Sequence, residues 1–199
     1  MISKILINPL KAWWQLHRSQ IAKSLITAIL VITYSWLLTT PALANIDDDK
    51  YDGNVFVLYA GNGSLVPARI SLAESLKTKK PSYIVFYIDD SSDCKQYSGV
   101  MSQMQAYYGK AASFIPVTPD SLETGRKYLN TEEGYYYKGV VPQTVIIDGE
   151  GKVRLDEIGQ VSFEKIDDTF REVFNLLPRT ESVALKRRSF NEYNSELTK

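Results

Sequence analysis

The run Tyr83-Ile-Val-Phe-Tyr-Ile88 constrains the fold of this chain more than any other feature. An unbroken apolar run that is rich in aromatic and β-branched side chains is typical of a strand covered on both faces. Such a strand needs helices or loops on both sides of its sheet. The run therefore predicts an α/β protein in which this segment is the central strand.

The patterns on either side of this run predict the remaining elements. Apolar residues at helical spacing predict helices over residues 70–76, 94–108 and 162–177. Runs rich in β-branched and aromatic residues predict further strands over residues 54–59, 113–118, 140–147 and 152–158. The last two strands form a hairpin around Asp148-Gly-Glu-Gly151, and the connection over residues 119–139 includes a short helix at 122–129. This order predicts a sandwich of helices on a sheet that has parallel strands and a terminal antiparallel hairpin.

The first 44 residues differ in composition from the rest of the chain. They contain basic residues but no Asp or Glu, residues 24–46 carry no charge, and small residues precede Asn45 in Pro41-Ala-Leu-Ala44. These features are typical of an export signal. Because about 20 apolar residues span a bilayer, the segment can also remain as an anchor. We expect residues 1–44 to be a signal peptide cleaved after Ala44 or a membrane anchor, with the rest of the chain beyond the membrane.

The rest of the chain has the size of one ordinary domain, predicted over residues 45–178. A tail over residues 179–199 carries Lys186-Arg-Arg188 and then apolar residues at helical spacing. This tail is either a helix that docks on the domain or a segment that binds a partner or a membrane surface. All 23 acidic residues but only 19 of the 23 basic ones follow residue 44, so a nucleic-acid partner is not expected.

Histidine and cysteine are almost missing. The only histidine is His17, within the first 44 residues, and the only cysteine is Cys94. The predicted domain therefore has no residues for Ser-His-Asp or Cys-His catalysis, for a histidine-built metal site or for a cysteine-bound cluster. It also has no internal disulfide. We expect neither a cofactor nor a metal.

Two segments carry a resemblance to thioredoxins. Phe86-Tyr-Ile-Asp-Asp-Ser-Ser-Asp-Cys-Lys95 resembles the strand that runs into Cys-x-x-Cys-Lys, and Gly139-Val-Val-Pro-Gln-Thr-Val-Ile-Ile-Asp-Gly-Glu-Gly-Lys-Val153 resembles the segment with the cis-proline and the hairpin. The similarity covers residues 55–177 and implies a thioredoxin-like fold, with a central mixed sheet flanked by helices. Aligned on Lys95, Ser91 replaces the first cysteine, so dithiol–disulfide exchange within the chain is excluded.

Three interpretations of Cys94 remain open. It is a buried residue in the first turn of a helix, a single thiol that forms mixed disulfides with a partner, or a peroxide-reactive thiol. The last follows from Ser91, because peroxiredoxins place Ser or Thr three residues before their reactive cysteine, although Tyr87 stands where they have a proline. The nearby Asp89, Asp90 and Asp93 suggest a cation site or, as the favoured interpretation, a solvated loop before a helix.

The thioredoxin resemblance also implies a peptide-binding groove. Pro142 matches the cis-proline that faces the active-site loop, where an extended peptide can pair with the neighbouring backbone. The residues expected to form this partner-binding groove are Ser91, Ser92, Asp93, Cys94, Val141 and Pro142. The tyrosines at positions 135–137 are either an exposed recognition patch or packing for the connection.

Short phrases throughout the chain resemble a narrower family, the cyanobacterial thylakoid membrane photosystem I accumulation factors. They are Tyr51-Asp-Gly-Asn54, Leu58-Tyr-Ala-Gly-Asn-Gly-Ser-Leu65, Asp93-Cys-Lys-Gln-Tyr97, Val141-Pro-Gln-Thr144 and Leu185-Lys-Arg-Arg-Ser-Phe-Asn191. The resemblance implies a lumen-facing thioredoxin-like protein that is needed for normal photosystem I levels. Our leading hypothesis is a non-catalytic factor that binds photosystem I subunits or their assembly intermediates, with the membrane contacted by the N-terminal segment. The alternative is a monothiol or peroxiredoxin-like redox protein that uses Cys94.

Overall fold

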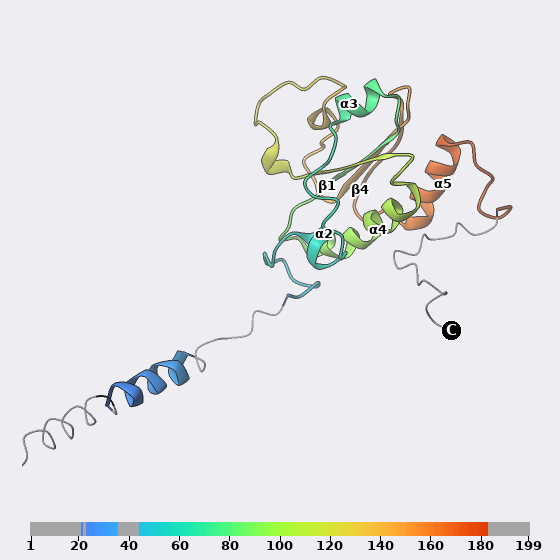
Figure 1. Cartoon of the computed structure of the whole chain (residues 1–199). Coiled ribbons are helices and arrows are strands. Elements are labelled where there is room, and N and C mark those ends of the chain that lie inside the picture. The colour runs from blue at the N-terminus through green and yellow to red at the C-terminus, as the bar shows by residue number, and fades with distance from the viewer. Residues whose placement is uncertain (1–20, 22, 36–43, 183–199) are drawn as a thin grey trace, which may run out of the picture. The chain divides into compact units, whose positions relative to one another are not determined.

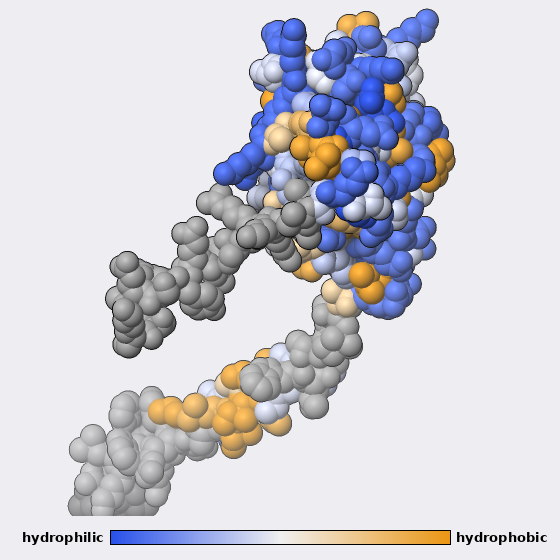
Figure 2. Space-filling model, turned by 90° about the vertical axis from the view of Figure 1, so that its right-hand side faces the viewer, coloured by the Kyte–Doolittle hydropathy of each residue, from blue (hydrophilic) through white to orange (hydrophobic). Residues whose placement is uncertain are grey.

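The computed structural model describes residues 21, 23–35 and 44–182, and the chain divides into two units, residues 1–43 and 44–199 (Figure 1). In the first unit, residues 23–35 are helical and expose apolar side chains, as Figure 2 shows. None of the described helices has the length and hydropathy needed to cross a membrane. The predicted apolar span runs into residues 36–43, and both these and most of the predicted tail lie outside the described residues.

The second unit contains a four-stranded mixed sheet in the order β2-β1-β3-β4. β1 runs parallel to β2 and antiparallel to β3, and β4 pairs antiparallel with β3. The strands are β1 (Ser82–Phe86), β2 (Ser113–Val117), β3 (Gln143–Ile147) and β4 (Val153–Ile158). This arrangement confirms the predicted central strand, the parallel pair and the hairpin.

β2 lies at an edge of the sheet, which explains how it accommodates Pro116. The backbone groups of Ser113 and Val117 bond toward β1, to Pro81 and Tyr87, so the alternating Pro116 faces the open edge. A proline at an edge position removes no hydrogen bond from the ladder.

Three helices occur where the sequence predicts them: α3 (Leu72–Lys77), α4 (Ser92–Tyr108) and α5 (Phe163–Val173). Each begins at a serine N-cap, which satisfies an otherwise unbonded N–H group of the first turn. α5 ends before the predicted Leu177, because Asn175 adopts a left-handed φ of 53° and the Leu176 N–H bonds back to the Arg171 carbonyl at 2.8 Å. This Schellman turn stops the helix.

The predicted first strand over residues 54–59 is wrong. The segment forms a short helix, α2 (Val55–Leu58). The Asn54 side chain caps it by accepting from the Phe56 N–H, and Asp89 accepts from the Val55 N–H at 2.9 Å. The β-type composition is overridden because these caps fix the backbone while Val55 and Phe56 of α2 are buried and α2 packs against α4.

The short helix predicted at residues 122–129 is also absent. The connection instead contains two 3₁₀ turns, η1 (Pro119–Ser121) and η2 (Glu133–Tyr135). Side chains hold the segment between them: the Glu123 N–H donates to Tyr128 Oη at 2.6 Å, and Arg126 pairs with Glu132 at 2.5 Å. These local bonds satisfy the connection without a helix.

The sheet separates two apolar clusters, because successive residues of a strand point to opposite faces. Tyr83 and Val85 of β1 join the cluster under α2, α4 and α5, whereas Ile84 and Phe86 join the cluster under α3. Figure 1 shows α3 on the opposite side of the sheet from α4 and α5. The first cluster includes Cys94 at the start of α4, and the second includes Tyr136 of the connection over residues 119–139.

Candidate functional site

The predicted groove residues come together at one end of the sheet. Phe86 pairs with Gln143, so the residues that follow β1 and those that precede β3 lie at the same end. The Val141–Pro142 bond is cis, and the Gly159 N–H donates to the Pro142 carbonyl at 2.7 Å. The next residue, Gln160, donates from its side chain to Asp93 at 3.0 Å. Through these two hydrogen bonds, Gly159 and Gln160 after β4 hold the Pro142 segment close to the start of α4.

Cys94 lies in the first turn of α4 and is only 2% exposed. Its backbone N–H donates to the Ser91 hydroxyl oxygen at 3.3 Å, so Ser91 serves as the N-cap of the helix. Burial raises the pKa of the Cys94 thiol, and the carboxylates of Asp93 and Asp89 act in the same direction. The environment therefore disfavours the thiolate form that thiol chemistry requires.

The next residue, Lys95, is enclosed by the segment that begins the second unit. Its side chain is fully buried, and its ammonium group donates to the carbonyls of Asn45 and Asp48 at 2.9 Å each. It also pairs with the carboxylates of Asp48 at 3.0 Å and Asp52 at 2.8 Å. Burial by itself lowers the pKa of Lys95, but the hydrogen bonds to these two aspartates outweigh it and raise the pKa above its ordinary value.

We call residues 45–52 the acidic clasp, because its aspartates bind the start of α4. Asp49 accepts from the backbone N–H and the hydroxyl of Ser92, both at 2.8 Å, and Asp47 accepts from Gln96 at 3.2 Å. Hydrogen bonds from Lys95 and Tyr59 lower the pKa of Asp52 to about 2. The clasp is thus hydrogen-bonded to the first turn of α4, beside Ser91 and Cys94.

The sequence interpretation missed this clasp. Asp47, Asp48, Asp49 and Asp52 lie within six residues, which alone indicates a solvated acidic stretch. The available signal was Lys95, which stands between Cys94 and Tyr97 on the predicted apolar side of the helix, since a buried lysine is almost always paired. Asp89 was also misjudged: it bonds to Asn54 and Val55 rather than lying in a solvated loop.

The six predicted groove residues differ in their exposure. Cys94 and Pro142 are buried, Asp93 is exposed, and the half-buried ones are Ser91, Ser92 and Val141. Ser92 is bonded to the clasp and Asp93 to Gln160. The adjoining Val140, which the sequence interpretation did not single out, is 45% exposed and offers apolar surface beside Pro142.

The predicted tyrosine patch has two parts. Tyr136 is buried and bonds through its hydroxyl to the Asn130 carbonyl, and Tyr137 packs against Phe86. Only Tyr135 is exposed.

The strand order, the helix that follows the central strand and the proline segment before β3 define a thioredoxin-like fold. No known family model matches the chain. Similar solved structures include a disulphide isomerase from Xylella fastidiosa, with 21% identity over 52% of this chain and 86% of that one and a TM-score of 0.36. StoA from Bacillus subtilis shares 13% identity over 46% and 83% of the two chains, with a TM-score of 0.32.

One curated relative is much more similar. The chain is 54% identical over 156 residues to thylakoid membrane protein slr1796 from the cyanobacterium Synechocystis, and the match covers 78% of each chain. The chain therefore belongs to the family of this thylakoid membrane protein.

Proposed function

We propose that this protein supports the accumulation or assembly of photosystem I at the thylakoid membrane, on the lumenal side, by binding proteins without catalysis. Two findings support the proposal: the thylakoid membrane relative and the thioredoxin-like fold. The photosystem I role comes from the resemblance of five short phrases to photosystem I accumulation factors. The proposed partners are photosystem I subunits or their assembly intermediates.

The state of Cys94 carries the non-catalytic part of this proposal. The thiol is 2% exposed, its pKa is raised by burial, and its neighbour Ser91 is engaged as a helix cap. In thioredoxin chemistry the attacking thiolate must be accessible and stabilised at the helix N-terminus. Here the acidic clasp is instead hydrogen-bonded to the first turn of that helix.

The same end of the sheet still offers a binding surface. Val140 is exposed beside Val141 and Pro142, and β3 follows directly. Apolar surface next to a sheet end can receive an extended segment of another protein. We propose Val140 and Val141 as the contact residues of this surface.

The test is complementation in a cyanobacterium that lacks the native gene, with photosystem I content per cell as the readout. We expect Cys94→Ala to restore photosystem I fully and Val140→Asp to restore it poorly. Val153→Asp is a matched control, because Val153 is 39% exposed and pairs with Ile147 at the opposite end of β3. A Cys94→Ala strain that fails to accumulate photosystem I, with normal protein level, would contradict a non-catalytic role.

The alternative is a monothiol or peroxiredoxin-like protein, which the position of Ser91 three residues before Cys94 favours. It requires an accessible thiolate, so it is tested by the alkylation rate of the native protein near neutral pH. Our proposal expects slow labelling that becomes fast in denaturant. The reference is Asp93→Cys in a Cys94→Ala background, since position 93 is exposed. Native Cys94 labelling as fast as this reference would support the redox alternative.

A further inference from the structure

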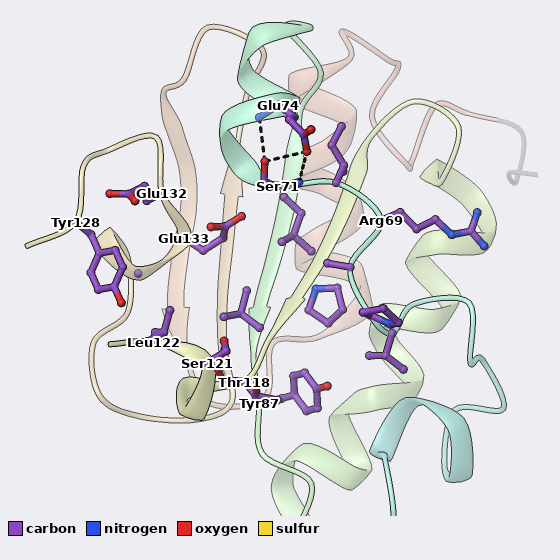
Figure 3. A pocket seen from close by; sticks show the side chains of 18 of the residues that line it. Arg69, Ser71, Glu74, Tyr87, Thr118, Ser121, Leu122, Tyr128, Glu132 and Glu133 are labelled. Atoms are coloured by element: carbon purple, nitrogen blue, oxygen red, sulfur yellow. Dashed lines mark hydrogen bonds between the residues drawn. The ribbon is translucent and has the colours of Figure 1, made fainter. Parts of the chain in front are cut away.

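The face of the sheet under α3 contains a pocket of about 730 Å³ (Figure 3). Three segments surround it: residues 66–71 before α3, the end of β2, and residues 118–134 of the connection. α3 is only six residues long, and the connection forms no helix over residues 122–129. The pocket exists because no long helix covers this face of the sheet in the described part of the chain.

The floor of the pocket is apolar, and its walls combine apolar with polar residues. Ile115 and Val117 of β2 reach it from the apolar cluster under α3, and Leu122 and Ala68 pack against the same cluster. Tyr128 adds an aromatic wall from the connection. Concave apolar surface of this size is typical of a site that binds a ligand or a side chain.

Carboxylates outnumber cations around this apolar surface. The acidic residues that line the pocket are Glu74, Glu123, Glu132 and Glu133, and the basic ones are Arg69 and Arg126. Arg126 is already paired, at 2.5 Å to Glu132 and 3.4 Å to Glu123. Figure 3 shows the Arg69 side chain directed away from Glu74 and Glu133.

Glu74 and Glu133 are therefore the lining carboxylates without a close ion pair among the described residues, although Lys77 lies near enough to act on the charge of Glu74. Glu74 accepts from the Ser71 N–H at 3.0 Å, and Glu133 accepts from the Leu72 N–H at 2.6 Å. Neither forms an ion pair with a described cation. The backbone hydrogen bonds hold both carboxylates in place, and those to Ser71 lower the pKa of Glu74, so it stays ionised near neutral pH.

We propose that this pocket docks a segment of a partner protein in which a basic side chain adjoins an apolar one. The apolar side chain lies on the Ile115 and Val117 floor, and the basic group pairs with Glu74 and Glu133. Charge complementarity selects this occupant, because an acidic segment would meet a lining in which carboxylates outnumber cations. Most of the pocket lies on the α3 side of the sheet, although Val66 and Tyr87 of its lining belong to the cluster that contains Cys94. None of the residues of the proposed Pro142 groove lines the pocket, so the site is a second interaction surface.

The proposal is tested by selecting a displayed library of random nine-residue peptides on the immobilised full-length chain. Recovered peptides are synthesised, and their affinities are measured by fluorescence anisotropy. We expect them to share Lys or Arg next to Leu, Ile, Val or Phe. Ser121→Trp, at an exposed position of the pocket lining, and the double change Glu74→Gln with Glu133→Gln should each weaken binding about tenfold or more.

The controls separate this site from the proposed groove and from misfolding. Gln keeps the carbonyl oxygen that accepts the backbone hydrogen bonds, and thermal unfolding shows whether each variant is folded. Glu150→Gln, in the exposed β3–β4 turn, and Val140→Asp should leave peptide binding unchanged. Peptides without a basic residue, binding unaffected by the pocket variants, or no enrichment at all would each overturn the proposal.

Discussion

The two faces of the sheet are covered in different ways, although they share the same strands. One face lies under α2, α4 and α5, where the ring of Phe170 stacks on Tyr108 at 4.8 Å and meets the rings of Tyr83 and Phe174 at 5.9 Å. The other lies under the short helix α3 and an irregular connection, which leave the pocket. The comparison shows that a long helix with a continuous apolar side closes a core, whereas local side-chain bonds can order a segment without filling the space beneath it.

The strongest test of this contrast removes one large side chain from each face. Phe170→Ala should lower the free energy of unfolding by about 3–5 kcal/mol, because Phe170 is fully buried among aromatic rings. Leu122→Ala should lower it by only about 1 kcal/mol, because Leu122 is half-buried and lines an open pocket. Urea unfolding measures both values, and similar losses for the two variants would contradict the difference in packing.

The clasp adds a charged component to the tightly packed face, and its contribution should depend on pH. The pKa of Asp52 is about 2 in the folded chain against an ordinary 3.8, so its stabilisation is complete above 3.8 and is lost as the pH falls through about 2. Asp52→Asn should therefore be less stable than the wild type near neutral pH, and the difference should shrink in this acid range. Denaturant unfolding at a series of pH values measures it.

The matched control for the clasp is Asp120→Asn, because Asp120 is exposed in η1. It should follow the wild-type pH dependence throughout. A constant difference between Asp52→Asn and the wild type across the acid range would show that Asp52 is not held as an ion partner of Lys95.

The smallest expected effect is on the α3 face. Lys79 follows the end of α3 with a left-handed φ of 54°, a conformation that favours glycine. Lys79→Gly should therefore raise the free energy of unfolding by about 0.5 kcal/mol. Lys77→Gly, the same change inside α3, should instead lower it by about 1 kcal/mol. If both variants lose stability equally, the left-handed position of Lys79 is not strained.

The sequence was most informative where apolar spacing is strong. The central strand, α4 and the α5 start were predicted because their apolar residues follow the periods of a buried strand or a helix, and tertiary contacts reinforce those periods. The strand prediction over residues 54–59 was wrong because a β-rich composition cannot reveal the cap that Asp89 supplies to Val55 from 34 residues away. The helix prediction at residues 122–129 was wrong because individual side-chain hydrogen bonds and ion pairs hold this connection. Such bonds leave no periodic pattern in the sequence.

The candidate site shows the same division. The sequence by itself determined that the chain has one cysteine, that Ser91 stands where a thioredoxin has its nucleophile, and that Pro142 precedes β3. These are properties of residue identity and order, so they need no coordinates. Only the tertiary structure decided that the clasp encloses Lys95, that Cys94 is buried and that a pocket opens under α3. Each of these depends on which distant segments share a surface, and burial, ion pairing and cavity volume arise only when those segments meet.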